Sequence, residues 1–269
     1  MKIAVGGKGG VGKTTVCAVW AQLFAQDGYD VLAVDADANP TLASAFGIPA
    51  NRSPKPLIEM KELIAERTST GRDAVGSYFK LNPRVSDLPQ EYSVKAADNV
   101  KLLVLGGITQ AGAGCACPQA AFLKAMLTYI ILQHNEMVLI DLAAGVECMG
   151  RAAVQGVDAL VVVVEPGGRS IETADAVAAM AGQLGIKTVV AIANKITDSA
   201  QTKLIESRIR GVPLLGSIRY DKAIGDADLK GEPAFNVGGQ LVDELKNAKD
   251  KLTALVRGQQ LMGTGYAGR

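Results

Sequence analysis

The stretch Gly6-Gly7-Lys8-Gly9-Gly10-Val11-Gly12-Lys13-Thr14-Thr15 decides the fold of this 269-residue chain. It follows the apolar run Ile3-Ala4-Val5 and precedes a helical pattern from Val16 to Ala25. This strand, glycine loop and helix are the context in which Gly-x-x-x-x-Gly-Lys-Thr binds phosphate. Backbone N–H groups of such a loop, and the N-terminus of the helix behind it, attract phosphate oxygens. The stretch therefore predicts a nucleotide-binding phosphate loop.

Two side chains of this loop have expected roles in chemistry. Lys13 is expected to reach the β- and γ-phosphates, and the Thr14 hydroxyl to bind Mg²⁺. The loop residues predicted to contact the nucleotide are Gly7, Lys8, Gly9, Gly10, Val11, Gly12, Lys13, Thr14 and Thr15.

A second lysine, Lys8, distinguishes this loop from an ordinary phosphate loop, which needs one. With it the sequence resembles the deviant phosphate-loop ATPases, which include the nitrogenase iron protein, the arsenite-pump ATPase and the division-site and partition ATPases. In that class the matching lysine crosses a dimer interface to the partner's nucleotide. The resemblance implies a homodimer and a catalytic role for Lys8. A solvated loop lysine is the alternative.

The composition favours a compact protein with little electrostatic attraction to polyanions. Hydrophobic residues make up 48% of the chain, the mean hydropathy is +0.19, and the net charge is +1 with a pI near 7.6. We therefore expect no nucleic-acid and no membrane partner. The first strand begins directly after Met1 and Lys2, and no apolar run approaches the ~20 residues of a membrane span. A cytoplasmic protein is expected, in which the four cysteines are free, metal-binding or catalytic.

Apolar runs alternate with helical patterns along the chain, which predicts a single α/β domain of the P-loop NTPase type. Its central sheet should be mostly parallel, with helices on both faces. Strands are predicted at 2–6, 30–35, 101–105, 137–141, 159–164, 187–193 and 213–217. Helices are predicted near 13–26, 57–67, 119–134, 171–184, 199–209 and 239–256. The domain should span 1–257, with an irregular excursion at 68–99 and a flexible tail at 258–269.

Two aspartates end the second predicted strand, in Val34-Asp35-Ala36-Asp37-Ala38-Asn39-Pro40. Carboxylates at this edge, beside the phosphate loop, can hold Mg²⁺-bound water or orient an attacking water. Asp37 aligns with the class's first switch, which implies that it positions the hydrolytic water. Asp35 is expected to be a structural or metal-shell partner. A capping turn is the alternative for both residues.

A third acidic residue ends the strand Met137-Val138-Leu139-Ile140-Asp141. An apolar strand ending in an acid is the usual form of the second Mg²⁺-shell aspartate, held through water. The sequence continues to Gly145, in a stretch that resembles the class's second switch. That resemblance implies that the Gly145 N–H senses the γ-phosphate.

Two later segments are candidates for the base. Asn194 and Lys195 end the strand that starts near residue 187, and the class's asparagine at this place reads the adenine edge. The residues Ile218, Arg219 and Tyr220 lie in a segment that resembles one wrapping the base. Asp198 lies one residue further on than a guanine-reading Asn-Lys-x-Asp motif requires, which favours ATP over GTP.

The segment Gly112-Ala113-Gly114-Cys115-Ala116-Cys117-Pro118 is a glycine-rich loop running into a helix. Pro118 suits the first helical position, which places Cys117 where a thiolate is stabilised. Two thiolates do not complete the four-coordinate shell that Zn²⁺ prefers. A two-fold dimer supplies two more. Two buried cysteines are the alternative.

Together these motifs resemble one subfamily, the maturation ATPases that deliver nickel to carbon monoxide dehydrogenase or acetyl-CoA synthase. The motifs run in order from Met1 to about Pro233, and include Asn82-Pro83-x-Val85-x-Asp87-x-Pro89. The resemblance implies an ATP-dependent homodimer in which Cys115 and Cys117 bind one Ni²⁺ or Zn²⁺ between subunits, and a nickel enzyme as client.

One residue departs from the pattern of this subfamily, and two others are expected to have structural roles. Many relatives have histidine where this chain has Cys148, which is either a substituted metal-relay residue or a small apolar side chain. Cys17 is expected in the core, and His134 at a helix end.

Two other function classes fit parts of the sequence. A positioning ATPase of the division-site or partition type would have a C-terminal amphipathic membrane helix or a DNA-binding patch. The helix at 239–256 has an apolar stripe, although packing on the sheet explains that stripe more simply. An iron–sulfur reductase or scaffold of the nitrogenase-iron-protein type would ligate a cluster, but with widely spaced single cysteines rather than a tight Cys-x-Cys.

Overall fold

The computed structural model describes residues 1–69, 79–107, 118–133, 137–143 and 156–264. Within these residues an eight-stranded sheet has the order β3-β4-β2-β5-β1-β6-β7-β8. All neighbouring strands are parallel except β3 and β4, which are antiparallel. The strands are β1 (Lys2–Gly6), β2 (Val31–Ala36), β3 (Val94–Ala97), β4 (Val100–Val104), β5 (Met137–Leu142), β6 (Ala159–Val164), β7 (Val189–Ile196) and β8 (Leu214–Arg219).

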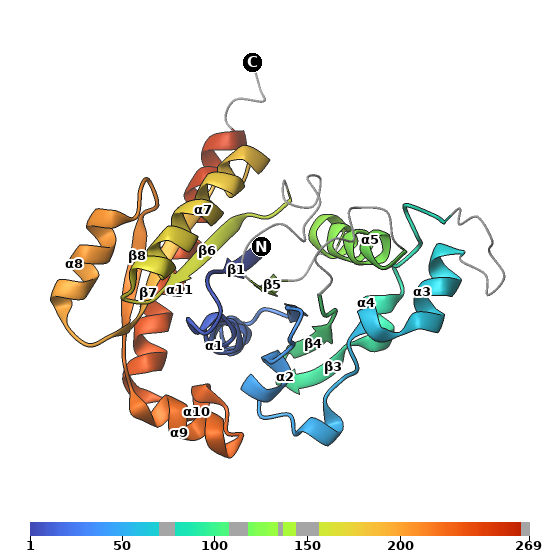
Figure 1. The fold of residues 1–269 in the computed structure, drawn as a ribbon, viewed down its shortest axis with the longest axis horizontal. Coiled ribbons are helices and arrows are strands. Elements are labelled where there is room, and N and C mark those ends of the chain that lie inside the picture. Colours follow the sequence, from blue (N-terminus) through green and yellow to red (C-terminus); the bar gives the residue numbers. More distant parts are fainter. Residues whose placement is uncertain (70–78, 108–117, 134–136, 144–155, 265–269) are drawn as a thin grey trace.

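Helices cover both faces of this sheet (Figure 1). The α-helices are α1 (Lys13–Gln26), α2 (Leu42–Ala45), α3 (Lys61–Thr68), α4 (Leu88–Tyr92), α5 (Pro118–Gln133), α7 (Gly168–Leu184), α8 (Ser199–Arg208), α9 (Lys222–Lys230), α10 (Ala234–Val237) and α11 (Gly239–Thr264). Two 3-10 turns, η1 (Ala50–Arg52) and η2 (Leu57–Glu59), precede α3. The α/β architecture with a mostly parallel sheet, expected from the sequence, is confirmed.

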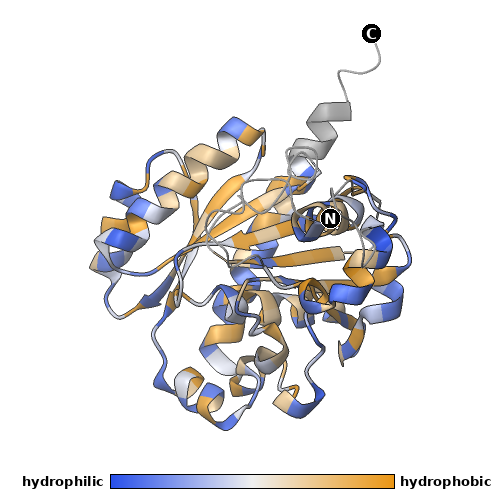
Figure 2. Ribbon diagram, turned by 45° about the vertical axis from the view of Figure 1, so that its right-hand side comes forward, coloured by the Kyte–Doolittle hydropathy of each residue, from blue (hydrophilic) through white to orange (hydrophobic). Residues whose placement is uncertain are grey.

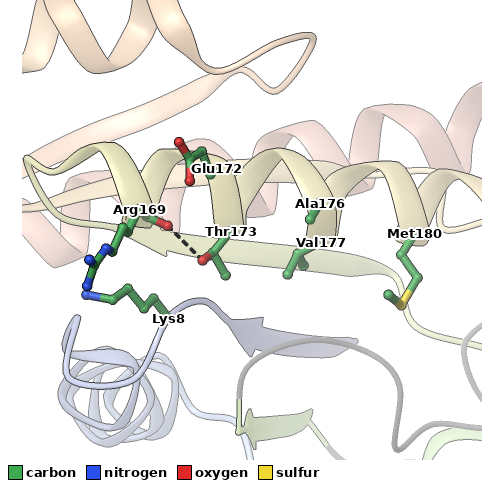
Figure 3. Close-up of a pocket in the computed structure, with 7 residues that line it drawn as sticks. All are labelled: Lys8, Arg169, Glu172, Thr173, Ala176, Val177 and Met180. Carbon is green, nitrogen blue, oxygen red and sulfur yellow. Dashed lines mark hydrogen bonds between the residues drawn. The ribbon is translucent and has the colours of Figure 1, made fainter.

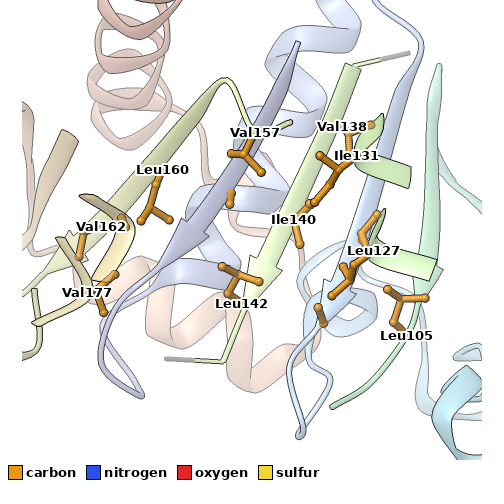
Figure 4. Packing of buried hydrophobic residues seen from close by; sticks show 14 of the residues in the cluster. Leu105, Leu127, Ile131, Val138, Ile140, Leu142, Val157, Leu160, Val162 and Val177 are labelled. Atoms are coloured by element: carbon orange, nitrogen blue, oxygen red, sulfur yellow. The ribbon is translucent and has the colours of Figure 1, made fainter. Parts of the chain in front are cut away.

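Strand side chains alternate between two hydrophobic layers. In β6, Leu160 and Val162 pack with α5 and α7 on one face, whereas Val161 and Val163 pack with α1 and α11 on the other. Both faces of the central strands are thus apolar, which is why these strands read as continuous hydrophobic runs. Figure 4 shows the first layer, where Val162 lies beside Val177 of α7. In Figure 2 the apolar strands lie between the covering helices.

The last helix is held against the first by two polar contacts. The Trp20 indole donates a hydrogen bond to the Leu245 carbonyl at 2.9 Å, and Lys249 pairs with Asp27 beneath the Phe24 ring. The apolar stripe of α11 therefore packs on α1 and β8, as its simpler interpretation predicted.

Four features differ from the sequence-based expectations. Residues 94–97 form an antiparallel edge strand inside the supposed irregular segment, since the Asp98–Asn99 turn, with φ +56° at Asn99, folds them back on β4. The helix expected at 57–67 is divided at Met60 into η2 and α3. The short helices α2, α4, α9 and α10 were not expected. Finally, α11 continues through 258–264, which the sequence analysis assigned to the tail.

Candidate functional site

The phosphate loop connects β1 to α1 at the carboxyl end of the sheet and requires glycine at two positions. A Cβ atom on Gly7 would lie 2.4 Å from the Val163 carbonyl oxygen, and one on Gly12 would lie 2.3 Å from Nδ2 of Asn194. Both glycines also have positive φ, +138° and +97°, which other residues rarely adopt. The loop therefore sits tightly against β6 and β7.

The two loop lysines occupy different environments. Lys13 is 5% exposed, and its ammonium donates to the Lys8 carbonyl at 3.3 Å. Lys8 is more exposed, and its ammonium pairs with Oε1 of Glu165 at 3.5 Å. A cavity of about 470 Å³ lies beside Lys8, against the α7 side chains Arg169, Glu172, Thr173, Ala176, Val177 and Met180 (Figure 3).

Asp141 lies at the end of β5, against the first residues of α1. Its Oδ2 accepts a hydrogen bond from the Thr14 hydroxyl at 2.6 Å, and the Thr14 oxygen is 3.2 Å from that of Thr41. Its Oδ1 is buried and has no hydrogen-bond partner among the described residues. Burial raises the pKa of Asp141 to about 7, although the Thr14 hydrogen bond opposes the rise. A buried carboxylate oxygen without a partner fits the requirement for a cation or a cation-bound water nearby.

Asp35 and Asp37 have different surroundings. The carboxylate of Asp35 is buried and accepts backbone N–H bonds from Asp37 at 3.1 Å and from Leu42 at 2.8 Å. Burial nevertheless raises its pKa. Asp35 therefore shapes the loop from β2 to α2. Asp37, in contrast, lines an open cleft beside the phosphate loop, and its Oδ1 accepts a hydrogen bond from the Asn39 N–H at 2.9 Å.

That cleft has a volume of about 970 Å³ and opens over the phosphate loop. It brings together many of the residues predicted from the sequence, which are Gly9, Gly10, Gly12, Lys13, Thr14, Thr15, Asp37, Asn194, Lys195, Arg219 and Tyr220. Three other predicted residues do not line the cleft. Val11 and Ile218 are buried, and Gly7 packs on β6.

Further lining residues were missed by sequence reasoning. They are Asn39, Thr41, Ser44, Ala45, Asp221, Ile224, Gly225, Asp228, Glu232, Ala234 and Leu241. Thr41 was detectable, since it directly follows the Asp-Ala-Asn-Pro run of the first switch. Asp221 was detectable as a helix cap, because its carboxylate accepts from the Ala223 N–H at 2.8 Å and starts α9.

At the end of β7, Asn194 and Lys195 both reach the phosphate loop. Asn194 Nδ2 donates to the Val11 carbonyl at 2.7 Å, and Lys195 Nζ donates to the Gly10 carbonyl at 2.6 Å. Lys195 also pairs with Oε2 of Glu165 at 3.4 Å. One glutamate therefore lies between Lys8 and Lys195.

Several predicted residues lie outside the described part of the chain. These are Cys115 and Cys117, the proposed thiolate ligands, together with His134, Gly145 and Cys148. In the described part, no group of three or more His, Cys, Asp or Glu residues is placed to hold a metal ion. Cys17 is fully buried, and burial raises the pKa of its thiol well above the usual value, as expected for a core residue.

Comparisons with known proteins agree with this geometry. A family model described as the CobQ/CobB/MinD/ParA nucleotide binding domain matches residues 2–234. The chain belongs to this family. It is 43% identical to the carbon monoxide dehydrogenase accessory protein CooC of Rhodospirillum rubrum, over 88% of this chain and 90% of that protein. It is 38% identical to an uncharacterized ATP-binding protein of Methanocaldococcus jannaschii, over 91% of this chain and 95% of the relative.

Solved structures of family members share the fold. The MinD cell division protein of Aquifex aeolicus superposes with a TM-score of 0.65 at 22% identity, covering 94% of this chain and 96% of that one. MinD of Pyrococcus horikoshii, solved with Mg-ADP, has a TM-score of 0.66 at 20% identity, covering 94% of this chain and 96% of that one. At these identities the likeness concerns the fold.

Family membership and the loop geometry make this chain an ATP-binding ATPase. The loop N–H groups and Lys13 would bind the phosphates. Mg²⁺ would be held by the Thr14 hydroxyl and, through water, by Asp141 and Asp37, and would neutralise phosphate charge. No helix in the described ranges is long and apolar enough to cross a membrane.

Proposed function

We propose that this ATPase forms a homodimer around a shared Ni²⁺ or Zn²⁺ and assists nickel insertion into a carbon monoxide dehydrogenase or an acetyl-CoA synthase. The carrying observation is the 43% identity, over 88% of the chain, to a carbon monoxide dehydrogenase accessory protein. Carbon monoxide dehydrogenase is proposed as a client on the basis of that relative's name. Nickel and the second client come from the resemblance of the sequence motifs.

The paired cysteines supply the chemistry for the cargo ion. Cys115 and Cys117 are separated by one residue within a glycine-rich segment, so both thiolates can bind one ion. A soft or borderline metal with four preferred ligands needs two more. A C₂ interface repeats every residue, so a second copy of the chain supplies them.

Lys8 supports nucleotide control of that dimer. Its pair with Glu165 is long, at 3.5 Å, and its side chain is 41% exposed. Such exposed pairs contribute roughly 0–1 kcal/mol. Leaving Glu165 for a partner's phosphates therefore costs Lys8 little, and ATP would draw it across the interface. Closure would reshape the shared metal site, and hydrolysis would reopen it to release the ion.

Metal analysis on the purified protein, with light scattering, tests the metal assignment. We expect one Ni²⁺ or Zn²⁺ per two chains in the wild type and its loss in Cys115→Ala. Cys17→Ala is the matched control, since this thiol is buried in the core and should leave loading unchanged. Full loading of Cys115→Ala would contradict the assignment.

The role of Lys8 has a separate test. Lys8→Ala should still bind ATP, because Lys13 and the loop N–H groups are kept, but it should lose hydrolysis and nucleotide-dependent dimerisation, because the contact across the interface is lost. Lys203→Ala, an exposed lysine on α8, is the control. Wild-type turnover in Lys8→Ala would remove the cross-subunit role while leaving the metal assignment standing.

A further inference from the structure

The end of β7 departs from regular strand geometry in two ways. Lys195 has φ +59°, in the left-handed region, and the register between β7 and β8 shifts between Ala193 and Ile196. A non-glycine residue in this region is strained and persists only where its surroundings hold it there. Bulge-like irregularities of this kind re-aim side chains beside functional sites.

The irregularity turns two consecutive side chains toward one target. Successive side chains in a regular strand point to opposite faces, yet Asn194 and Lys195 both contact the phosphate loop, at 2.7 Å and 2.6 Å. The amide oxygen of Asn194 is also occupied, because Oδ1 accepts a hydrogen bond from the backbone N–H of Lys195 at 2.9 Å. Among the described residues, this leaves one amide N–H of Asn194 without a hydrogen-bond partner.

The two carbonyls that these side chains hold are consecutive. In a planar trans peptide, the C=O of one residue and the N–H of the next point in opposite directions. Fixing the Gly10 carbonyl toward Lys195 therefore turns the Val11 N–H away from it. Fixing the Val11 carbonyl toward Asn194 does the same for the Gly12 N–H. Oriented N–H groups of this kind are what a phosphate loop uses to bind anions.

The contacts that Asn194 and Lys195 make with the phosphate loop involve two further residues. Oε2 of Glu165, from the end of β6, lies 3.4 Å from Lys195 Nζ and gives that ammonium a second partner. A Cβ atom at position 12 would lie 2.3 Å from Nδ2 of Asn194 and would displace that amide from the loop, and the φ of +97° at Gly12 also favours glycine.

We propose that Asn194 and Lys195 are positioning residues for ATP hydrolysis, which set the phosphate-binding N–H groups of the loop through its Gly10 and Val11 carbonyls. This interpretation differs from the expectation that Asn194 reads the adenine edge. It rests on nucleotide binding at the phosphate loop and is independent of the proposed metal and client.

The two interpretations are separated by a ligand that lacks a base. Dissociation constants for Mg-ATP and for magnesium tripolyphosphate are measured by calorimetry on the full chain, for the wild type, Lys195→Ala and Asn194→Asp. Asp keeps the shape of Asn but cannot donate to the Val11 carbonyl. Lys187→Ala, at the opposite end of β7 and exposed, is the matched control.

We expect both variants to bind ATP and tripolyphosphate about tenfold more weakly, a factor that corresponds to ~1.4 kcal/mol, with the same factor for each ligand. Lys195→Arg should recover much of the loss, because it keeps a cationic donor. The ratio of kcat/KM for ATP over GTP should stay at its wild-type value in Asn194→Asp.

Partial unfolding of a variant would also weaken both ligands by one factor, so circular dichroism without ligand establishes that each variant is folded before its dissociation constants are compared. Weaker ATP binding with unchanged tripolyphosphate binding, or a collapsed ATP-to-GTP ratio in Asn194→Asp, would overturn the proposal in favour of base recognition. Unchanged affinity for both ligands would overturn it outright. Lys13→Ala, which should bind neither ligand, shows separately whether the loop is the nucleotide site.

Discussion

Asp141 should make the nucleotide-free protein less stable as the pH rises. Its pKa is about 7 in the folded chain, against an ordinary value of 3.8, and burial is the main cause. The folded state therefore holds this proton more tightly than the unfolded state does. The contribution of Asp141 to the free energy of unfolding is therefore largest below about pH 4 and is lost as the pH rises through 7.

The size of the effect follows from the two pKa values. They differ by about 3, and each pKa unit corresponds to about 1.36 kcal/mol, so the full contribution is about 4 kcal/mol. Between pH 5 and pH 8 the part contributed by Asp141 is roughly 2–3 kcal/mol. The group is fully buried, so solvent screening does not reduce this figure much.

Asp141→Asn removes the titration while keeping the shape of the side chain. Urea denaturation without nucleotide or Mg²⁺, at pH 5 and pH 8, gives the free energy of unfolding of each variant. We expect the loss of stability between the two pH values to be about 2 kcal/mol smaller in Asp141→Asn than in the wild type. Asp243→Asn, an exposed residue on α11, should behave as the wild type does. Parallel pH profiles for wild type and Asp141→Asn would refute the reasoning.

Two further predictions concern packing. Gly7→Ala should abolish ATP binding in a calorimetric titration, since its Cβ would lie 2.4 Å from the Val163 carbonyl oxygen. Gly182→Ala, on α7 and with open space around its Cβ, is the control and should bind normally; equal binding by both variants would contradict the steric argument. Trp20→Phe should lower the free energy of unfolding by about 1–2 kcal/mol, since the indole hydrogen bond to the Leu245 carbonyl is lost. An unchanged denaturation midpoint in Trp20→Phe would show that this bond does not stabilise the contact between α1 and α11.

The sheet and the phosphate loop were predictable because their signals are local. Each central strand is a continuous apolar run, and the glycines that permit positive φ lie within the motif itself. The antiparallel pairing of β3 was missed, since Val94-Lys95-Ala96-Ala97 has little strand propensity and forms a strand only against β4. The helix α9 was missed because Gly225, Asp226 and Asp228 have low helix propensity and weaken its helical pattern.

The orientation of Asn194 and Lys195 could not be predicted either. A regular strand would send them to opposite faces, and their shared direction depends on the left-handed backbone at Lys195 and on the register shift against β8. Similarly, the sequence left Asp35 between two roles. Its two backbone hydrogen bonds within the loop that follows β2 favour the structural one.

The position of Glu165 between two lysines has a thermodynamic consequence. Its two oxygens hold Lys8 at 3.5 Å and Lys195 at 3.4 Å. In the proposed dimer, Lys8 would leave Glu165 for the partner's phosphates, and the carboxylate would then face Lys195 alone. Because Lys195 also donates to the Gly10 carbonyl, the departure of Lys8 would change how the phosphate loop is held. By linkage, nucleotide binding at the loop would change the free energy of that departure by the same amount.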